Sequence, residues 1–431
     1  MKVIEPSLND EDLDRLQRDT FRYFAEEINL ENGLIADNTR ADSPSSIAVV
    51  GFALTAYPIA VERKYMSRSE AVKRALISLR FFHDGPQGPG EDAIGFNGFY
   101  YHFLDMKTGR RFGDAEISTI DTTYLIAGAL TAAEYFNRDT AGERELRALA
   151  YSLYDRADWQ WAQNKSLTVT HGWRPKKGFI KYRWHGYSEA LILYILGLAS
   201  QTYPLPEESY RAWTKTYQWK RIYGREFLYA GPLFIHHLSH LWIDFRGIQD
   251  DYMRGKAINY FENSRRAIYT QQEYAMRNPK NFARYGRFSW GITASDGPGP
   301  ATRRINGKKV RFHAYLARAI PFGPDDGTLS PWAVAASLPF APEVVLPTLH
   351  RINVDFPEIT SKYGFKCSYN PTFTAGGRKG WVSQGYYGLD QGPIVMMIEN
   401  YRTGLIWRLM RRCPYLVNGL RRAGFSGGWL G

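Results

Sequence analysis

Apolar residues recur at helical spacing in many segments of the chain, and this pattern predicts a series of helices. In the run "WHGYSEALILYILGLAS", every residue from Ala190 to Ala199 is apolar, aromatic or glycine, as in a helix buried nearly all round. Glu189 stands directly before that apolar stretch. Helices are predicted over Asn9–Ile28, Ser46–Arg63, Ser67–His83, Ser118–Asn137, Ala141–Ala157, Tyr187–Ser200, Ile248–Met276, Pro331–Ala341, Pro342–Val354 and Leu389–Met410.

Strand patterns are few and short, and Lys308–Ala317 is the best of them. Long loops rich in Gly, Pro and aromatic residues separate the helices, and no linker or low-complexity run divides the chain. We therefore expect one all-α domain over residues 1–431, ending in a basic tail at 404–431. About ten to twelve helices in antiparallel pairs suggest an α/α toroid, two concentric rings whose loops form a cleft at one end.

The composition is that of an ordinary globular protein, with 44% hydrophobic and 23% charged residues. Its two cysteines, Cys367 and Cys413, stand far apart, which excludes a disulfide framework, and neither carries a local sign of activation. The N-terminus has no apolar core of signal-peptide length, and no segment is apolar enough to cross a membrane. The sequence as given predicts a cytoplasmic protein, or a periplasmic one if an export signal has been removed.

The formal net charge of +12 is partly local, because residues 400–431 contain no Asp or Glu but six arginines. This tail has two interpretations: a basic amphipathic segment in peripheral contact with an anionic membrane, or a solvated helix packed on the body, which we favour. Charge alone would also suit nucleic acid. The basic residues are spread along the chain, however, so we expect no nucleic-acid partner.

Acidic and aromatic residues gather where loops enter apolar helices. For each acid alone, helix capping or a dipole interaction is a sufficient explanation. Several acids beside aromatic rings, however, are what a sugar-binding cleft requires, because glycoside cleavage uses one carboxylic acid and one carboxylate. The residues in these positions are Glu116, Asp121, Asp244, Arg246, Trp290, Asp296, Trp381 and Asp390.

Glu189 suits the acid role, because the apolar helix behind it should raise its pKa and hold the proton near neutral pH. A metal site is a weaker alternative: His236, His240 and Asp244 have helical ligand spacing, but no HExxH motif is present. Motifs for nucleotide binding and serine hydrolysis are absent as well. We expect neither a metal nor a cofactor.

Six ordered motifs resemble the glycoamylase-like domain of glycoside hydrolase family 144. They are "STIDTTYLIAGAL", "GYSEALILYILGLAS", "LSHLWIDFRGIQD", "WGITASDGP", "DGTLSPWAVAASLPFAPE" and "GLDQGPIVMMIENYRTGLIW". The resemblance runs from about Leu13 to Met410. It implies an (α/α)6 barrel and hydrolysis of linear or cyclic β-1,2-glucan with inversion at the anomeric carbon.

Carried over by motif, the resemblance implies that Glu189 of "GYSEA" is the general acid and Asp390 of "GLDQGP" the base. Asp296 is the next candidate for the acid. Glu116 and Asp121 would hold substrate hydroxyls, and the remaining subsites would be lined by Asp244, Arg246, Trp290, Asp296 and Trp381.

Three alternatives stay open. A related branch, the cyclisation domain of cyclic β-1,2-glucan synthases, is a retaining transglycosylase that shares much of this motif set. An exo-acting β-glucoside hydrolase is a second alternative, and a non-catalytic glucan-binding protein a third, although the presence of both Glu189 and Asp390 disfavours it. The net charge also suggests that the glucan carries anionic substituents, which a positive cleft rim would attract.

Overall fold

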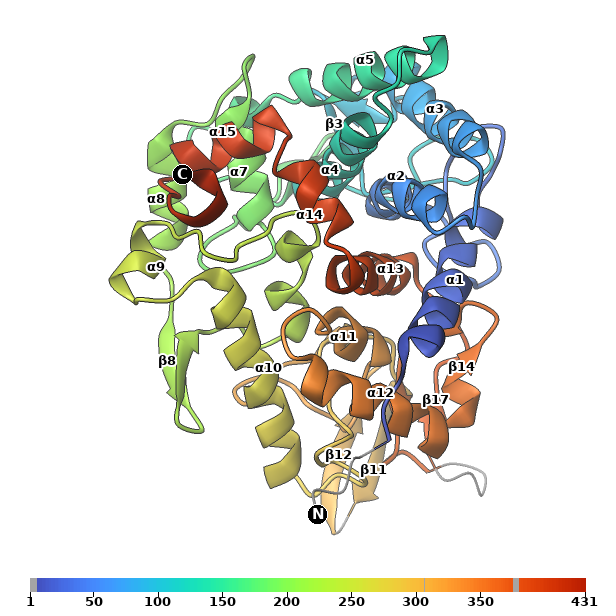
Figure 1. Ribbon diagram of the computed structural model, residues 1–431, viewed down its shortest axis with the longest axis vertical. Coiled ribbons are helices and arrows are strands. Elements are labelled where there is room, and N and C mark those ends of the chain that lie inside the picture. The colour runs from blue at the N-terminus through green and yellow to red at the C-terminus, as the bar shows by residue number, and fades with distance from the viewer. Residues whose placement is uncertain (1–5, 306, 375–379) are drawn as a thin grey trace. The chain divides into compact units, whose positions relative to one another are not determined.

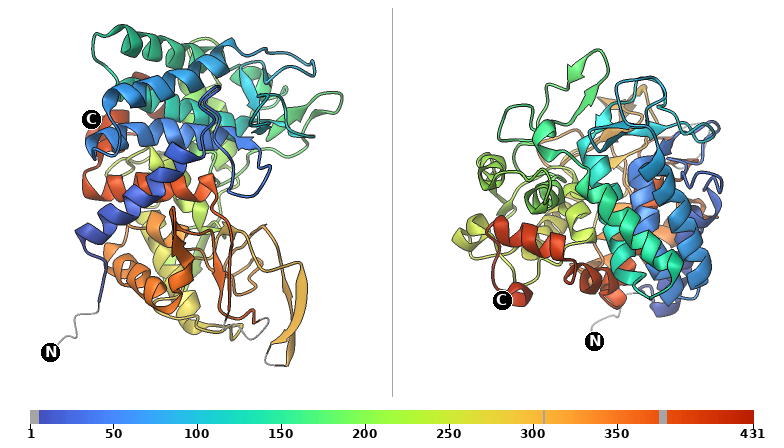
Figure 2. Two further views of the ribbon diagram at one scale, coloured as in Figure 1. Left: turned by 90° about the vertical axis from the view of Figure 1, so that its right-hand side faces the viewer. Right: turned by 90° about the horizontal axis from the view of Figure 1, so that it is seen from above.

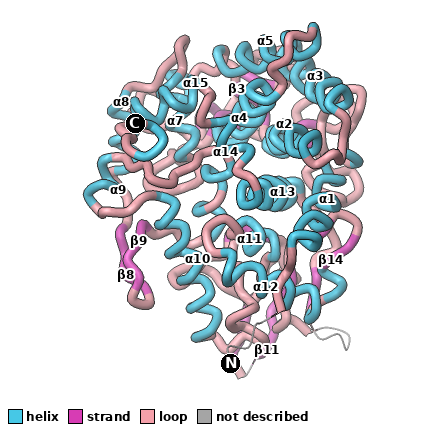
Figure 3. Tube along the Cα trace, in the orientation of Figure 1, coloured by secondary structure: helices cyan, strands magenta, loops and turns pink. Residues whose placement is uncertain are grey.

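The structure is a computed structural model that describes residues 6–305, 307–374 and 380–431. It is largely helical, as the apolar periodicity predicts (Figures 1 and 3). The α-helices are α1 Asp10–Glu26, α2 Ile47–Glu62, α3 Arg68–Asp84, α4 Thr119–Tyr135, α5 Ala141–Asp155, α6 Trp159–Ala162, α7 Leu191–Ala199, α8 Glu207–Thr214, α9 Asp251–Gly255, α10 Tyr260–Arg277, α11 Pro331–Ala336, α12 Pro342–Asp355, α13 Gly388–Arg402, α14 Leu405–Met410 and α15 Pro414–Arg422.

The backbone divides into two compact units, each built from three segments. Unit 1 comprises Met1–Tyr23, Gln218–Leu238 and Phe261–Arg402. Unit 2 comprises Phe24–Tyr217, Ser239–Tyr260 and Thr403–Gly431. A compact unit is not by itself a separately folding domain, so the expectation of a single domain stays a prediction.

In unit 2, the helices α2 and α4 form the apolar centre, and α3 and α5 pack beside them. Two glycines allow α2 and α4 to approach closely, because a Cβ on Gly128 would lie 2.0 Å from the carbonyl oxygen of Gly51. Ridges of ordinary side chains would hold the helix axes further apart.

A five-stranded antiparallel sheet, also in unit 2, has the order β2-β3-β5-β6-β7. Its strands are β2 Gly95–Phe96, β3 Phe99–Tyr101, β5 Ile117–Ser118, β6 Gly172–Arg174 and β7 Gly178–Phe179. Ser118 ends β5 and is also the N-cap of α4, so the sheet leads directly into the central helix. The periodicity of the sequence does not predict this sheet, because strands of two or three residues are too short to show an alternating pattern.

Unit 1 holds α11, α12 and α13, with α11 packed on both of the others. Short hairpins surround them, and the hairpin of β11 with β12 extends away from the helices of this unit (Figure 2). The predicted strand at Lys308–Ala317 corresponds to β12 and β13. The remaining strand pairs of the described chain are β1 Ser45–Ser46 with β4 Phe103–Leu104, β8 Trp219–Ile222 with β9 Arg225–Leu228, β10 Ala294–Ser295 with β13 Leu316–Ala317, β11 Ala301–Ile305 with β12 Lys308–Phe312, β14 Thr360–Ser361 with β15 Gly364–Phe365, and β16 Tyr369–Asn370 with β17 Trp381–Val382.

Two predicted helices are each divided in the structure. The predicted helix at Ile248–Met276 breaks into α9 and α10, and Ala257 between them has φ 55°, a left-handed conformation that no helix can continue through. The predicted helix at Leu389–Met410 breaks into α13 and α14 at Gly404, where φ is 69°. The predicted helix at Tyr187–Ser200 begins only at Leu191, which leaves Glu189 in the turn that precedes α7.

The basic tail folds as α14 and α15, and most of its apolar side chains are buried in unit 2. The large buried ones on these two helices are Leu405, Ile406, Trp407, Leu409, Met410, Leu416 and Leu420. Of the two interpretations of the tail, packing on the body agrees with this burial. Within the described ranges, every helix is too short or too polar to traverse a bilayer.

Candidate functional site

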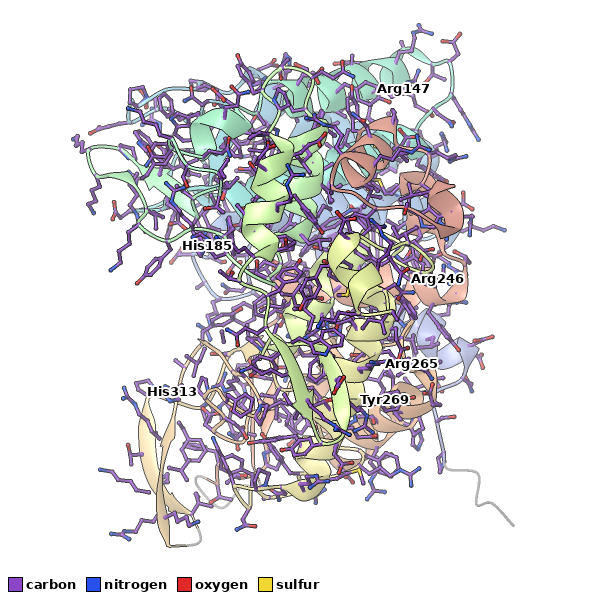
Figure 4. All side chains as sticks on the ribbon, turned by 90° about the vertical axis from the view of Figure 1, so that its left-hand side faces the viewer. Arg147, His185, Arg246, Arg265, Tyr269 and His313 are labelled. Carbon is purple, nitrogen blue, oxygen red and sulfur yellow. The ribbon has the colours of Figure 1, made fainter. Side chains whose placement is uncertain are left out.

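Glu189 lies in a turn that is tied to the rest of unit 2 through Ser239. The Ser239 hydroxyl donates to the carbonyl oxygen of Glu189 at 3.2 Å, and it accepts a hydrogen bond from the amide of Ile192, also at 3.2 Å. One side chain thus fixes both the turn and the first residues of α7. His185, four residues before Glu189, lies at the surface (Figure 4).

The pKa of Glu189 is raised to about 7. Burial is the main cause, because it disfavours the charged form, and the negative charge of Asp121 adds to it. The backbone amide of Glu189 acts in the opposite direction, but with a smaller effect. A carboxyl with this pKa keeps a substantial protonated fraction at neutral pH, as a proton donor in glycoside cleavage must.

Glu116 and Asp121 lie together in unit 2, because Glu116 directly precedes β5 and α4 begins at Thr119, three residues after Glu116. Asp121 occupies the first turn of α4. Its amide donates to the hydroxyl of the N-cap Ser118 at 3.2 Å, and that hydroxyl donates to the Asp121 carboxylate. Helix capping therefore accounts for part of the Asp121 environment, which is the alternative explanation that the sequence analysis gives for each acid. The carboxylate oxygen Oδ2 of Asp121 also lies 3.6 Å from Nε2 of His102.

His102 is a member of this cluster that the sequence interpretation does not identify. It lies between β3 and β4, in the run "FYYHFL", away from any helix start. Burial alone would lower its pKa, but Asp121 and Glu116 outweigh that effect and raise the pKa to about 9. In return, the bond with His102 is the main cause that lowers the pKa of Glu116 to about 2.

Asp390 and Asp296 lie in unit 1, and Cys367 joins them. Asp390 is in the first turn of α13 and is 2% exposed. The amide of Asp296 donates to the sulfur of Cys367 at 3.3 Å, and the hydroxyl of Ser383 donates to Oδ2 of Asp296 at 3.1 Å. The pKa of the Cys367 thiol is raised first by burial and then by the Asp390 carboxylate. Burial likewise raises the pKa of the Cys413 thiol to about 12, so both thiols are protonated at neutral pH, in agreement with the prediction that neither cysteine is activated.

The structure thus groups the predicted site residues by unit. Glu116, Asp121 and Glu189 share an electrostatic environment in unit 2, whereas Asp296 and Asp390 share one in unit 1. Their roles as catalytic and substrate-binding residues stay predictions.

Asp244 and Arg246, both in unit 2, pair with each other, and Asp244 also pairs with the C-terminal tail. Nε and Nη2 of Arg246 donate to the two carboxylate oxygens of Asp244 at 2.8 and 2.7 Å, and Arg411 of the tail donates to the same carboxylate. The indole of Trp429 donates to the backbone oxygen of Asp244 at 2.7 Å. Asp244 is 1% exposed, whereas Arg246 reaches the surface (Figure 4) and its guanidinium lies 4.5 Å from the ring centre of Trp407. This network holds the C-terminal tail.

The two tryptophans predicted for sugar contact differ in exposure. Trp290 is 0% exposed and its indole donates to the hydroxyl of Thr348 at 3.0 Å, which is the environment of a core residue. That burial disfavours direct stacking on a sugar. Trp381 in β17 is half-buried, so part of its ring is accessible, and it pairs with Asn370 of β16.

The side chains of the described residues form no group of three His, Cys, Asp or Glu suited to a metal ion. Of the histidines with ligand spacing, His236 is buried, and burial lowers its pKa to about 4. The Nε2–H of its neutral ring donates to the backbone oxygen of Ala230, 3.3 Å away. His240 instead packs against Phe245, with ring centres 4.7 Å apart.

The family model described as "Putative glucoamylase" matches residues 181–414. This match covers more than half of a chain that is largely helical and carries acids at its helix starts. The chain therefore belongs to this glycoamylase family, and the predicted resemblance is confirmed.

Individual relatives align along nearly the whole chain. A putative glucoamylase from Bacteroides uniformis has 30% identity and a TM-score of 0.87, covering 99% of this chain and 100% of the other. An endo-β-1,2-glucanase from Chitinophaga pinensis has 28% identity and a TM-score of 0.86, covering 98% and 100%. An exo β-1,2-glucooligosaccharide sophorohydrolase from Parabacteroides distasonis is 28% identical over 97% of this chain. The present chain spans only 58% of that curated relative.

Proposed function

We propose that this protein is a glycoside hydrolase that cleaves β-1,2-glucan, linear or cyclic, by general acid and base catalysis. The observation that carries the proposal is the environment of Glu189, which lies just before the N-terminus of α7 and whose pKa is raised to about 7. The named activities of two relatives, an endo-β-1,2-glucanase and a sophorohydrolase, support the choice of substrate.

In the proposed reaction, Glu189 donates its proton to the glycosidic oxygen as the bond from that oxygen to the anomeric carbon breaks. Asp390 removes a proton from the water that attacks the anomeric carbon from the opposite face. The products are two shorter sugars with inverted configuration at that carbon. Glu116 and Asp121 are proposed to accept hydrogen bonds from substrate hydroxyls.

We propose further that the helices form an (α/α)6 barrel. Helix pairs within each unit support it, including α2 with α4, α3 with α5, α7 with α15 and α11 with α13. Burial of the large apolar side chains of α14 and α15 in unit 2 disfavours peripheral contact of the tail with a membrane.

Incubation of the protein with linear and cyclic β-1,2-glucan tests the proposal, with products separated by chromatography and their anomeric form followed by NMR. Short products released with inversion support it, and their lengths distinguish endo from exo attack. Retained or cyclic products would assign the protein to the transglycosylase branch. Absence of any product from either glucan would overturn the proposed substrate.

A further inference from the structure

At one end of the unit 2 sheet, three charged residues lie side by side: His102 directly follows β3, Glu116 directly precedes β5, and Arg174 ends β6. Tyr101 of β3 pairs with Ile117 of β5, and Ile117 pairs with Trp173 of β6. At the next position of this antiparallel register, His102 lies opposite Glu116 and Glu116 opposite Arg174, and the amide of His102 donates to the backbone oxygen of Glu116 at 2.8 Å. Residues opposite each other in an antiparallel pair share a face, so their side chains meet.

The middle carboxylate of this row is bound from both sides. Nδ1 of His102 lies 3.1 Å from Oε1 of Glu116, and Nη2 of Arg174 donates to Oε2 at 3.2 Å. The other ring nitrogen of His102, Nε2, lies 3.6 Å from Oδ2 of Asp121. The ring is also stacked on Phe103, with centres 3.8 Å apart. Both ring nitrogens thus face carboxylates. Only the doubly protonated, cationic imidazole has an N–H on each nitrogen and can donate to both carboxylates.

This part of unit 2 is rich in acids. Asp37 is a further carboxyl of the cluster: burial raises its pKa, and the charge of Asp121 raises it further, whereas Asn38 and His102 act against this. Glu189 also experiences the charge of Asp121, and both acids act on the hydroxyl of Tyr124, whose pKa is raised mainly by burial. A cation at His102 therefore stands among several carboxyls that would otherwise repel one another.

We propose that His102 is a positioning residue for glucan cleavage, whose cationic ring holds Glu116 and Asp121 in one orientation and offsets the negative field of Asp121 at Glu189. The proposal rests on the proposed function, because it assigns His102 a role through the general acid. A purely structural role would require only the shape of the ring on Phe103. The electrostatic role requires the charge, and this difference can be measured.

Two NMR titrations of the whole protein test the charge without any substrate. In the wild type, the ring of His102 should stay protonated beyond pH 8, in accord with its pKa of about 9. In His102→Gln, Asp121 loses the cation that lies 3.6 Å from its carboxylate, so the titration midpoint of Glu189, followed with carboxyl-labelled glutamate, should rise by about half a pH unit to one unit. Glu189→Gln assigns the signal.

His83→Gln is the matched control, because His83 also pairs with a carboxylate, 2.7 Å from Asp84, but at the exposed end of α3. It should leave the Glu189 midpoint unchanged. With glucan as substrate, the alkaline limb of the kcat/KM profile should shift to higher pH in His102→Gln by the same amount as the Glu189 midpoint. It should not shift in His83→Gln.

A His102 ring that titrates below pH 7 in the folded wild type would overturn the proposal. This measurement uses the wild type alone, so it does not depend on whether a variant folds. An unchanged Glu189 midpoint in folded His102→Gln would overturn it too. These outcomes are distinct from failure of the proposed function, in which the wild type would release no product from β-1,2-glucan while both titrations could still be read.

Discussion

Asp121 and Glu189 are two carboxyls of unit 2 that interact: after burial, the negative charge of Asp121 is the largest influence that raises the pKa of Glu189, to about 7. Only the protonated carboxyl can donate, so the rate should fall as pH rises through this value. We therefore expect the kcat/KM profile on β-1,2-glucan to have an alkaline limb near pH 7. Initial rates from pH 4 to 10 measure it, and a rate that stays level up to pH 9 would contradict the assignment of Glu189 as the acid.

Substitution of Glu189 by Gln keeps the shape of the side chain and removes its proton. Loss of a proton donor should lower kcat by on the order of a hundredfold to ten-thousandfold while substrate binding largely survives. Initial rates and calorimetric binding of a glucan oligosaccharide measure the two effects separately.

Glu134→Gln is a matched control for that substitution. Glu134 also lies in unit 2, near the end of α4, and burial raises its pKa too, against the effect of Arg412. It belongs to no predicted site, so kcat should change by less than about twofold. If both variants lost activity equally, the defect would reflect the loss of a half-buried acid from unit 2 and not the loss of the proton donor.

The ion pairs of His102 also predict a pH-dependent contribution to stability. The pKa of His102 is about 9 in the folded protein, whereas that of a histidine in the unfolded chain is about 6.5. The stabilisation from its ion pairs is therefore fully present below about pH 6.5 and is lost as pH rises through about 9. The difference in melting temperature between wild type and His102→Gln should therefore shrink between pH 6.5 and 9.5. A constant difference over this interval would mean that His102 contributes only packing.

The sequence could predict where acids meet apolar helices. Glu189 and Asp390 stand at the starts of long apolar runs, and the structure places them in the turn before α7 and in the first turn of α13. This prediction succeeds because the burial of an apolar helix and the position of an acid at its N-terminus are both local properties of the chain.

The sequence could not predict the partners of those acids. His102 meets Glu116 through the register of strands only two or three residues long, which leave no periodic signal. Cys367 reaches Asp296 across 71 residues of sequence. Such contacts depend on the tertiary fold, and the residue types alone do not indicate them. Trp290 is the opposite case, since its position in a loop beside an acid suggested contact with a sugar, yet its ring is packed in the core.

Asp244 is expected to act mainly on stability. Its buried carboxylate accepts hydrogen bonds from Arg246 and Arg411, so Asp244→Asn would leave guanidinium groups without their counter-ion. We expect the free energy of unfolding to fall by about 1–3 kcal/mol, because a buried ion pair loses one partner while the arginines keep partial contact with water. Thermal or chemical denaturation measures it.

The exposed ion pair of Asp139 with Arg144 provides the comparison for Asp244. Asp139→Asn should change the free energy of unfolding by less than about 1 kcal/mol, the usual range for surface pairs. A large rise in KM of folded Asp244→Asn without loss of stability would instead support the sugar-binding role that the family resemblance implies.

Gly128 on α4 permits the close approach of α2. A methyl group there would lie 2.0 Å from the oxygen and 2.6 Å from the carbon of the Gly51 carbonyl, and both are backbone atoms that cannot move aside alone. Gly128→Ala should therefore lower the free energy of unfolding by about 1–3 kcal/mol or more, as overpacking of a dense core does.

Gly142→Ala, on α5, is the control, because its methyl group would meet Val72 at an ordinary 3.4 Å. There the better helix propensity of alanine should leave stability unchanged or raise it by up to about 1 kcal/mol. Denaturation of both variants decides the matter: equal effects would mean that helix propensity, and not the contact between α2 and α4, determines the result.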